Sequence, residues 1–328
     1  MRGPLEELDR AAGLGIDKLV RAHHRRRLRR VGRGSQLEPP EGGLWAAGDP
    51  PPREGCRLEI LIDGAEALPR ISAALDQART EINIAAWAIT PDFGLDRDEG
   101  ARRLRDHLAE LAEQVDVRVL LWAGAPLPVF SPRRSQVRQI RDELMQGSKV
   151  QCALDSRERP MHCHHEKLVI VDGKVAFVGG IDLTSLGGDR FDSDDHPARG
   201  KIGWHDASTR LEGPAVADVA DHFAARWHEV TGERLPPTPP PPPAGEHEVQ
   251  VIRTVPEKIY DFLPQGDFRI LESYQRALRS ARSLVYLENQ FLWAPQVVEI
   301  LVDKLRNPPS DRFRVVIVLP SKPNNGAD

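Results

Sequence analysis

A histidine, a lysine and an aspartate stand in the order HxKxxxxD within the segment HHEKLVIVDGKVAFVGGIDL, residues 164–183. They are His165, Lys167 and Asp172. Side chains two residues apart on an extended segment point to the same face, so His165 and Lys167 can meet one phosphate together. An imidazole nitrogen can attack phosphorus and form a covalent phosphohistidine, while an ammonium neutralises charge on the non-bridging oxygens. The spacing therefore predicts cleavage of a phosphodiester.

The remaining residues of this segment differ in how strongly they support phosphodiester chemistry. Asp172 follows the apolar run Leu168 to Val171, where a buried carboxylate needs partners, so it is predicted to be structural as much as catalytic. The three spaced residues alone are moderate support for this chemistry. Gly179 and Gly180 at the expected distance strengthen the match considerably. The alternative is a surface β-hairpin with an incidental histidine.

The same segment, followed by GGDRFD, by WHD at 204–206 and by LEGPAVADVADHFAARW, resembles the first catalytic half of a phospholipase D. Its GGIDL form resembles the plant and eukaryotic-like branch of that superfamily. Many other branches have a serine after the first glycine and an asparagine where Asp182 stands. The resemblance implies an enzyme of two pseudo-symmetric lobes, each with one HxKxxxxD motif. One histidine would attack phosphorus and the other would protonate the leaving alcohol.

The resemblance also implies roles for residues outside the motif. Asp206 matches the acid that holds the ring of the nucleophilic histidine, since a carboxylate on one ring nitrogen fixes the tautomer. The alternative is that Asp206 only caps the strand that follows it. His164 matches the histidine that precedes the catalytic one and is expected to pack or hydrogen-bond near it. Gly179, Gly180 and Asp182 complete the supporting set.

Composition limits the class of protein. The chain has 328 residues, 40% of them hydrophobic and 29% charged, which is typical of an ordinary soluble globular protein. A net charge of -4 argues against bulk or specific nucleic-acid binding. No apolar run approaches the roughly 20 residues that cross a bilayer, and the N-terminus lacks the apolar core of a signal peptide. These features, with three sparse cysteines, predict a cytoplasmic or peripheral membrane protein.

Two clusters of charged or metal-ligating residues have alternative interpretations. Seven arginines lie between Arg21 and Arg33 with no acid among them. They are interpreted either as a contact with an anionic membrane or as a solvated basic helix end. The segment MHCHH, residues 161–165, contains soft metal ligands, but neighbours on a strand point to opposite faces. No metal and no cofactor are therefore expected.

The chain divides at a proline-rich segment. Residues 236–248 read PPTPPPPPAGEHE, a stiff extended spacer. We predict a basic helical extension over 1–50, a first catalytic lobe over 51–230, a linker over 231–248 and the beginning of a second lobe over 249–328. In the first lobe, periodicity predicts strands at 57–63, 81–89 and 117–122 and helices at 69–78, 100–113 and 135–145. This alternation predicts an α/β fold, a phospholipase D-like mixed sheet flanked by helices.

The order of elements begins again after the spacer. Residues 67–89 are echoed by residues 267–292, and the strand around Val119 by that around Val316, which indicates an internal duplication. The repeat places a second catalytic histidine near position ~360. The chain is therefore expected to be a partial version of a two-motif enzyme, with the second motif in a missing C-terminal part. Glu288, Asn289 and Gln290, in YLENQF, are candidates to contact substrate there, or they lie at a strand end in solvent.

The predicted function is a phospholipase D-type phosphodiesterase or transphosphatidylase. It would cleave the headgroup diester of a phospholipid through a phosphohistidine at His165, with water or an alcohol as acceptor. A cardiolipin or phosphatidylserine synthase would use the same residues with a different acceptor. A nuclease-like phosphodiesterase of the same superfamily and a non-catalytic lipid-binding remnant are further alternatives.

Overall fold

The computed structural model describes residues 4–96, 102–126, 131–159, 162–184 and 205–320. Contacts divide the chain into two compact units: the larger is Pro52–Val251, and the smaller joins Met1–Pro51 to Ile252–Pro323. Residues 1–50 were predicted to form a basic helical extension. They group with the residues after 252, and Leu28 and Leu37 pack with Phe268 in one small core.

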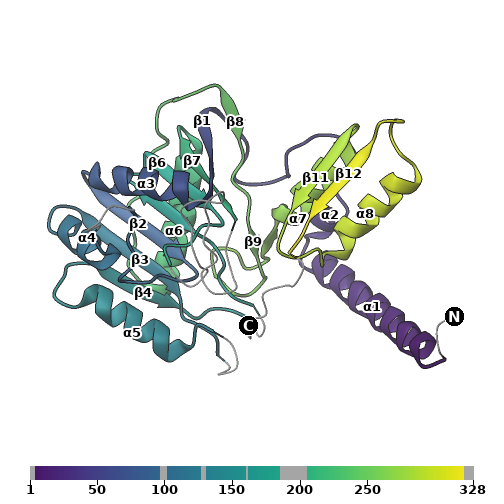
Figure 1. Ribbon diagram of the computed structural model, residues 1–328, viewed down its shortest axis with the longest axis horizontal. Coiled ribbons are helices and arrows are strands. Elements are labelled where there is room, and N and C mark those ends of the chain that lie inside the picture. Colours follow the sequence, from purple (N-terminus) through teal and green to yellow (C-terminus); the bar gives the residue numbers. More distant parts are fainter. Residues whose placement is uncertain (1–3, 97–101, 127–130, 160–161, 185–204, 321–328) are drawn as a thin grey trace. The chain divides into compact units, whose positions relative to one another are not determined.

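The larger unit is built on one mixed eight-stranded sheet in the order β4-β3-β2-β5-β6-β7-β1-β8 (Figure 1). Its strands are β1 Arg53–Ile62, β2 Glu81–Ala86, β3 Asp116–Trp122, β4 Gln151–Asp155, β5 Leu168–Val171, β6 Val175–Gly179, β7 Ala207–Glu212 and β8 His247–Val249. β2, β3 and β4 run parallel to one another, whereas each neighbouring pair from β2-β5 through to β1-β8 is antiparallel. The predicted α/β fold with a mixed sheet is confirmed.

Helices cover both faces of this sheet. α3 Asp63–Asp76, α4 Leu104–Leu111 and α5 Arg134–Met145 pack on one face, and α6 Ala215–Thr231 packs on the other. Alternation along the strands separates the two cores, since Ile84 faces the first group of helices and its neighbour Ala85 faces α6. Strands buried on both faces read as continuous apolar runs, which explains LVIV in β5.

The turn between β5 and β6 is braced by Asp172. This residue has a φ of 53°, and its carboxylate accepts the amides of Arg79, Thr80 and Glu81 at 2.7 to 3.1 Å. Burial raises the pKa of the Asp172 carboxyl, but these hydrogen bonds outweigh it and hold the pKa below the ordinary value. The carboxylate therefore ties the β5-β6 turn to the beginning of β2.

The proline-rich segment packs along the edge of the large sheet. The amide of Ala244 donates to Gly55 O at 2.8 Å, and His247 and Val249 of β8 pair with Cys56 and Arg53 of β1. The segment was predicted as a stiff spacer. The three residues before Gln250 form β8 at the edge of the sheet, because they lie beyond the last proline and have amides for an edge strand.

The smaller unit contains helices and two pairs of short strands (Figure 1). Its elements are α1 Pro4–Arg30, α2 Gly34–Leu37, β9 Thr254–Val255, β10 Asp267–Phe268, α7 Arg269–Ser280, β11 Leu284–Glu288, α8 Pro295–Arg306 and β12 Arg314–Val318. β11 and β12 are parallel, and α8 connects them. Among the helices of the described chain, none is long and apolar enough to cross a membrane.

The order helix, strand, helix, strand occurs in both units. In the larger unit it is α3, β2, α4 and β3, and in the smaller unit α7, β11, α8 and β12. The two strands of each set are adjacent and parallel. This common order agrees with the echo between residues 67–89 and 267–292, whose common origin stays a prediction.

Replacing Asp172 with alanine should destabilise the larger unit, because three backbone amides lose their acceptor. We expect a loss of about 1–3 kcal/mol in the free energy of unfolding, measured by urea denaturation at pH 7. The depressed pKa means that the contribution of this carboxylate is present at neutral pH and lost as the pH falls below about 4.

A matched control is Asp92→Ala, since Asp92 is exposed and pairs only on the surface with Arg103 at 3.1 Å. Its cost should stay within about 0.5 kcal/mol. Equal effects of the two substitutions would contradict a bracing role for Asp172.

Candidate active site

The HxK residues lie at one edge of the large sheet, where the parallel strands end. Register places Trp122, the last residue of β3, opposite Asp155, the last residue of β4. Trp87 directly follows β2, and Lys167 directly precedes β5, whose first residue pairs with Ala85. The carboxyl ends of parallel strands in an α/β sheet are where ligand sites form. The site therefore has the position expected for this class of fold.

His165 and Lys167 come together at this edge. Lys167 Nζ lies 3.4 Å from His165 Nδ1 and 3.4 Å from the His165 carbonyl oxygen. The His165 side chain stays accessible to solvent, whereas Lys167 is buried. Partial desolvation, with the nearby Lys167 ammonium, lowers the pKa of the His165 imidazole to about 4. The ring is therefore neutral at physiological pH, as a nucleophile requires.

Asp182 holds the Lys167 ammonium in place. Its Oδ2 atom lies 3.0 Å from Lys167 Nζ, and its side chain is only 1% exposed. Burial raises the pKa of the Asp182 carboxyl, and the Lys167 ammonium opposes that rise. A buried ammonium without a carboxylate would carry a large desolvation cost. Asp182 thus explains how a lysine can be kept charged beside the histidine.

The two glycines allow β6 to approach the segment before β7. A Cβ atom at Gly179 would lie 2.4 Å from Ser208 Cα, and one at Gly180 would lie 2.0 Å from Asp206 Oδ1. Gly180 N also donates to Ala207 O at 2.9 Å. Any side chain at either position would therefore displace the segment that carries Asp206.

The Asp206 carboxylate lies next to Gly180 of this glycine pair. Its Oδ1 atom accepts the amide of Ala207 at 2.8 Å. Burial raises the pKa of its carboxyl by more than the Ala207 amide and the Lys167 charge lower it. Both residues are described, and no hydrogen bond joins Asp206 to the His165 ring. Its predicted role in holding that ring therefore stays a proposal.

Asp63 was not singled out in the sequence, although it anchors the Asp206 segment. It is buried, has a φ of 58° and accepts the amide of Asp206 at 3.0 Å and His205 Nδ1 at 2.9 Å. Its own amide donates to Asp206 O at 2.8 Å. Strained backbone of this kind persists only where surrounding contacts maintain it. The sequence signal that could have found Asp63 was an Asp-Gly pair, Asp63-Gly64, directly after an apolar strand.

Two tryptophans, also missed in the sequence, form a wall of the site. Trp87 stacks on Trp122 with ring centroids 6.2 Å apart. The Trp87 ring also lies 5.5 Å from the His165 ring, and Lys167 Nζ lies 5.6 Å from the Trp87 centroid. A cation over an aromatic face is favourable. Both motif side chains are therefore packed against one rigid indole.

The structure does not bring every predicted residue to this edge. Asp172 lies after β5, whereas Lys167 lies before it, so their Cα atoms are about 16 Å apart along the extended chain. Glu288, Asn289 and Gln290 belong to the smaller unit, where they are exposed at the end of β11, and Tyr286 donates to Glu288 at 2.8 Å. The GGDRFD segment and Trp204 lie outside the described residues.

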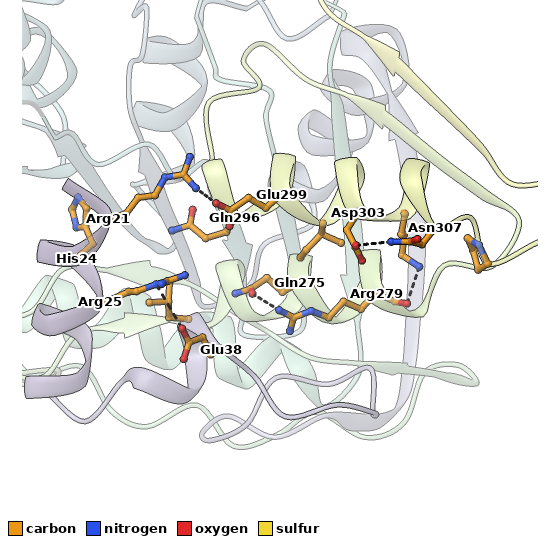
Figure 2. Close-up of a pocket in the computed structure, with 14 residues that line it drawn as sticks. Arg21, His24, Arg25, Glu38, Gln275, Arg279, Gln296, Glu299, Asp303 and Asn307 are labelled. Carbon is orange, nitrogen blue, oxygen red and sulfur yellow. Dashed lines mark hydrogen bonds and ion pairs between the residues drawn. The ribbon is translucent and has the colours of Figure 1, made fainter. Parts of the chain in front are cut away.

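A separate cavity of about 420 Å³ lies in the smaller unit, among α1, α7 and α8 (Figure 2). Its charged groups pair with one another, as Arg21 does with Glu299 and Arg25 with Glu38. The HxK residues do not line it. Among the residues whose placement is described, no group of three histidine, cysteine, aspartate or glutamate side chains could hold a metal ion.

Comparisons with known proteins identify relatives of this chain. The family model PLDc, phospholipase D, matches residues 74–203, a span that includes His165, Lys167 and Asp182. Phospholipase D zeta 1 of Arabidopsis thaliana is 29% identical over 61% of this chain and 22% of its own length. Cardiolipin synthase of Geobacillus kaustophilus is 24% identical over 88% of this chain and 53% of its own length. This chain thus spans about half or less of either relative.

A solved structure is similar at a lower level. Nuc from Salmonella typhimurium, titled a phospholipase D family member, matches 55% of this chain and 99% of its own, with 14% identity and a TM-score of 0.38. A similarity of that size adds nothing to the argument. The family match over the HxK segment and the sequence relatives together support membership of the chain in the phospholipase D superfamily.

The His165 ring should titrate near pH 4, as followed by NMR with His165→Ala to assign its signal. Between pH 6.5 and about 4 the unfolded chain binds a proton that the folded ring does not, so this group should lower stability as the pH falls through that range. Lys167→Met removes the neighbouring charge and should raise the ring pKa towards 6.5.

Lys174→Met is the control, because Lys174 is exposed in the β5-β6 turn at the far end of β5. It should leave the His165 titration unchanged. A wild-type ring that titrates near its ordinary pKa would contradict this description of the site.

Proposed function

We propose that this chain is a phospholipase D-type phosphodiesterase that cleaves the headgroup diester of a phospholipid. The observation that carries the proposal is a neutral, accessible imidazole at His165 beside a buried ammonium at Lys167. A nitrogen of His165 attacks phosphorus, a phosphorus–nitrogen bond forms, and the bond to the headgroup oxygen breaks. Water or an alcohol then attacks the phosphohistidine and releases the lipid product.

Lys167 and Asp206 have separate roles in this proposal. The Lys167 ammonium is held by Asp182 and binds the non-bridging oxygens of the phosphate, where negative charge accumulates. A bound phosphate would draw the hydrogen bonds of the ammonium away from His165 Nδ1. That nitrogen can then carry the proton that the Asp206 carboxylate accepts, which leaves the other nitrogen for attack.

The leaving oxygen needs a proton, and we propose that a second HxKxxxxD motif provides it. The sequence of 328 residues contains one such motif, at His165. A second motif from outside these residues, in a longer product or in another copy of the chain, would supply the acid and a second lysine. Glu288, Asn289 and Gln290 remain proposed contacts of that half-site.

A phosphatidyl transfer is the second candidate reaction. The named cardiolipin synthase and the named phospholipase D zeta 1 are 24% and 29% identical to this chain, so the relatives support an alcohol as well as water as the acceptor. The same phosphohistidine serves both outcomes. They differ only in the acceptor that attacks it, so products distinguish them.

Acidic partners accompany several arginines of the cluster from Arg21 to Arg33, for which contact with an anionic membrane was predicted. Arg27 pairs with Glu257 at 3.3 Å and Arg29 with Glu38 at 3.0 Å within the smaller unit. Arg21 and Arg25 pair there as well. These acids reduce the positive charge that α1 offers to lipid headgroups.

The reaction is tested by incubating phosphatidylcholine and ethanol with the wild-type chain, with any longer product of its reading frame, and with His165→Ala in each. We expect phosphatidylethanol from a wild-type form and a loss of at least about 10³-fold in His165→Ala. Parallel incubation with phosphatidylglycerol identifies cardiolipin formation. Cleavage of a simple phosphodiester without any lipid product would favour a nuclease-like enzyme. Lipid binding without turnover would favour a non-catalytic remnant.

Asp182→Asn should reduce this reaction by about 10²-fold, because the buried ammonium loses its carboxylate and its position. The free energy of unfolding should fall as well. Asp218→Asn is the matched control, since buried Asp218 on α6 pairs with Arg53 on β1 at 2.8 Å and touches none of the site residues. It should lower stability without reducing the rate per folded molecule. Equal rates in the two variants would contradict the role of Asp182.

A further inference from the structure

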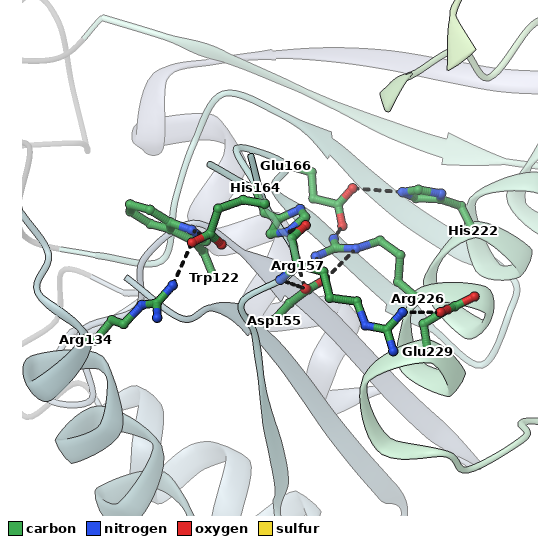
Figure 3. A network of polar contacts seen from close by, with 10 residues as sticks. Trp122, Arg134, Asp155, Arg157, His164, Glu166, His222, Arg226 and Glu229 are labelled. Atoms are coloured by element: carbon green, nitrogen blue, oxygen red, sulfur yellow. Dashed lines mark hydrogen bonds and ion pairs between the residues drawn. The ribbon is translucent and has the colours of Figure 1, made fainter. Parts of the chain in front are cut away.

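The two residues that flank His165 are held from the side of the chain opposite its ring. His165 and Lys167 both contact Trp87. The side chains of His164 and Glu166 instead reach β4 and α6, as expected for neighbours on an extended segment (Figure 3). Described residues 162–167 form no helix or strand. The position of His165 therefore depends on side-chain contacts rather than on a backbone ladder.

Glu166 is held by two residues of α6. His222 Nε2 donates to Glu166 Oε2 at 2.9 Å, and the Arg226 guanidinium forms an ion pair with the other carboxylate oxygen. His222 and Arg226 are four residues apart and so share one face of the helix. Both are buried. Glu166 is thus fixed in direction by two donors on a rigid element.

His164 is held through Asp155. His164 Nε2 lies 3.3 Å from Asp155 Oδ1 and 3.2 Å from Arg157 O. Asp155 is fully buried at the end of β4, and its Oδ2 atom accepts Arg226 Nη2 at 2.7 Å. Arg226 therefore bridges the anchors of both neighbours of His165 (Figure 3). A buried pair of this geometry resists displacement because either partner alone would be an uncompensated charge.

We propose that Asp155, His164, Glu166, His222 and Arg226 form a clamp that fixes the backbone on both sides of His165 and so aims its imidazole at phosphorus. They are positioning residues, because their side chains face away from the reacting ring. The proposal rests on the proposed function for its kinetic consequence. Its structural consequence, a fixed orientation of the His165 ring, is measurable without turnover.

The test compares Glu166→Gln with Glu233→Gln. Glu166→Gln weakens the clamp at its accessible end and leaves the buried Arg226–Asp155 pair intact, so the chain is expected to fold. Glu233 accepts Trp227 Nε1 at 2.8 Å just after α6 and touches no residue of the clamp, which makes it a matched control. His222→Gln is a second clamp variant with its own fold check. Melting temperature is measured for each.

Two measurements report on the clamp. The first is kcat and KM for cleavage of the diester in the form that passes the ethanol-transfer assay. We expect Glu166→Gln to lower kcat by at least about tenfold with KM within about threefold, because misplacement of the nucleophile affects the chemical step. Glu233→Gln should change neither constant.

The second measurement is the NMR titration of the His165 ring. Charged groups near that ring are Lys167 on its own segment, with Asp182 after β6 and Asp206 before β7 facing the lysine. None of them is altered in the variants. A ring freed from its place beside Lys167 and Trp87 should titrate closer to 6.5 in Glu166→Gln and His222→Gln, and as wild type in Glu233→Gln.

The outcomes separate the two proposals. Unchanged kcat and an unchanged ring titration in both clamp variants would overturn the clamp. So would losses that follow the melting temperature equally in Glu166→Gln and Glu233→Gln. If no wild-type form, this chain or a longer product, cleaves a diester and the ring titration still moves as expected, the clamp stands and the proposed reaction fails.

Discussion

A buried ammonium is the constraint on which the site depends. Lys167 stands at the end of a fully buried strand, so its charge requires a carboxylate within the fold. Asp182 meets that need at 3.0 Å. It follows Gly179 at the end of β6 and Gly180 after it, and the absence of side chains at these glycines lets the chain pass close to Asp206 and β7. The same close passage brings Asp206 to the site. The need to pair the buried ammonium of Lys167 thus accounts for Asp182, and the glycine pair accounts for the closeness of Asp206.

Alternation along residues 164–167 divides the segment into two sides with different tasks. His165 and Lys167 face the indole of Trp87, where the proposed phosphate would bind. His164 and Glu166 face β4 and α6, where buried charges are paired. In the proposed reaction, a nucleophile on an irregular segment gains its position from such contacts. The conformational entropy of the segment is then lost during folding rather than at the moment of reaction. The framework of the sheet and the chemistry at its edge are therefore closely coupled.

The sequence predicted the parts of this site that depend on local spacing. Periodicity gave the α/β class and the existence of the first-lobe strands and helices, and the HxK spacing gave the pairing of His165 with Lys167. Periodicity placed the start of the first helix of this lobe, α3, at Pro69. The helix begins at Asp63, because burial of Gly64 and Ala67 against the sheet outweighs the missing amide of the proline.

Residues joined by tertiary contacts were less predictable. Trp87, Trp122 and Asp155 meet through the register of three parallel strands, which no local pattern encodes. Asp63 and Arg226 reach the site from elements far away in the chain. Asp172 shows the opposite case, since it belongs to the motif by spacing but braces a turn at the other end of β5. Membership in a motif and presence at the reacting atoms are therefore separate properties.

The proposed reaction requires a covalent bond between His165 and phosphorus. Mass spectrometry of a rapidly quenched reaction, kept alkaline because phosphohistidine is labile to acid, detects such a bond. A phosphatidyl adduct is expected on the peptide that contains His165, formed before product and absent from His165→Gln. Product formation without an adduct, or an adduct on another histidine, would rule out His165 as the nucleophile.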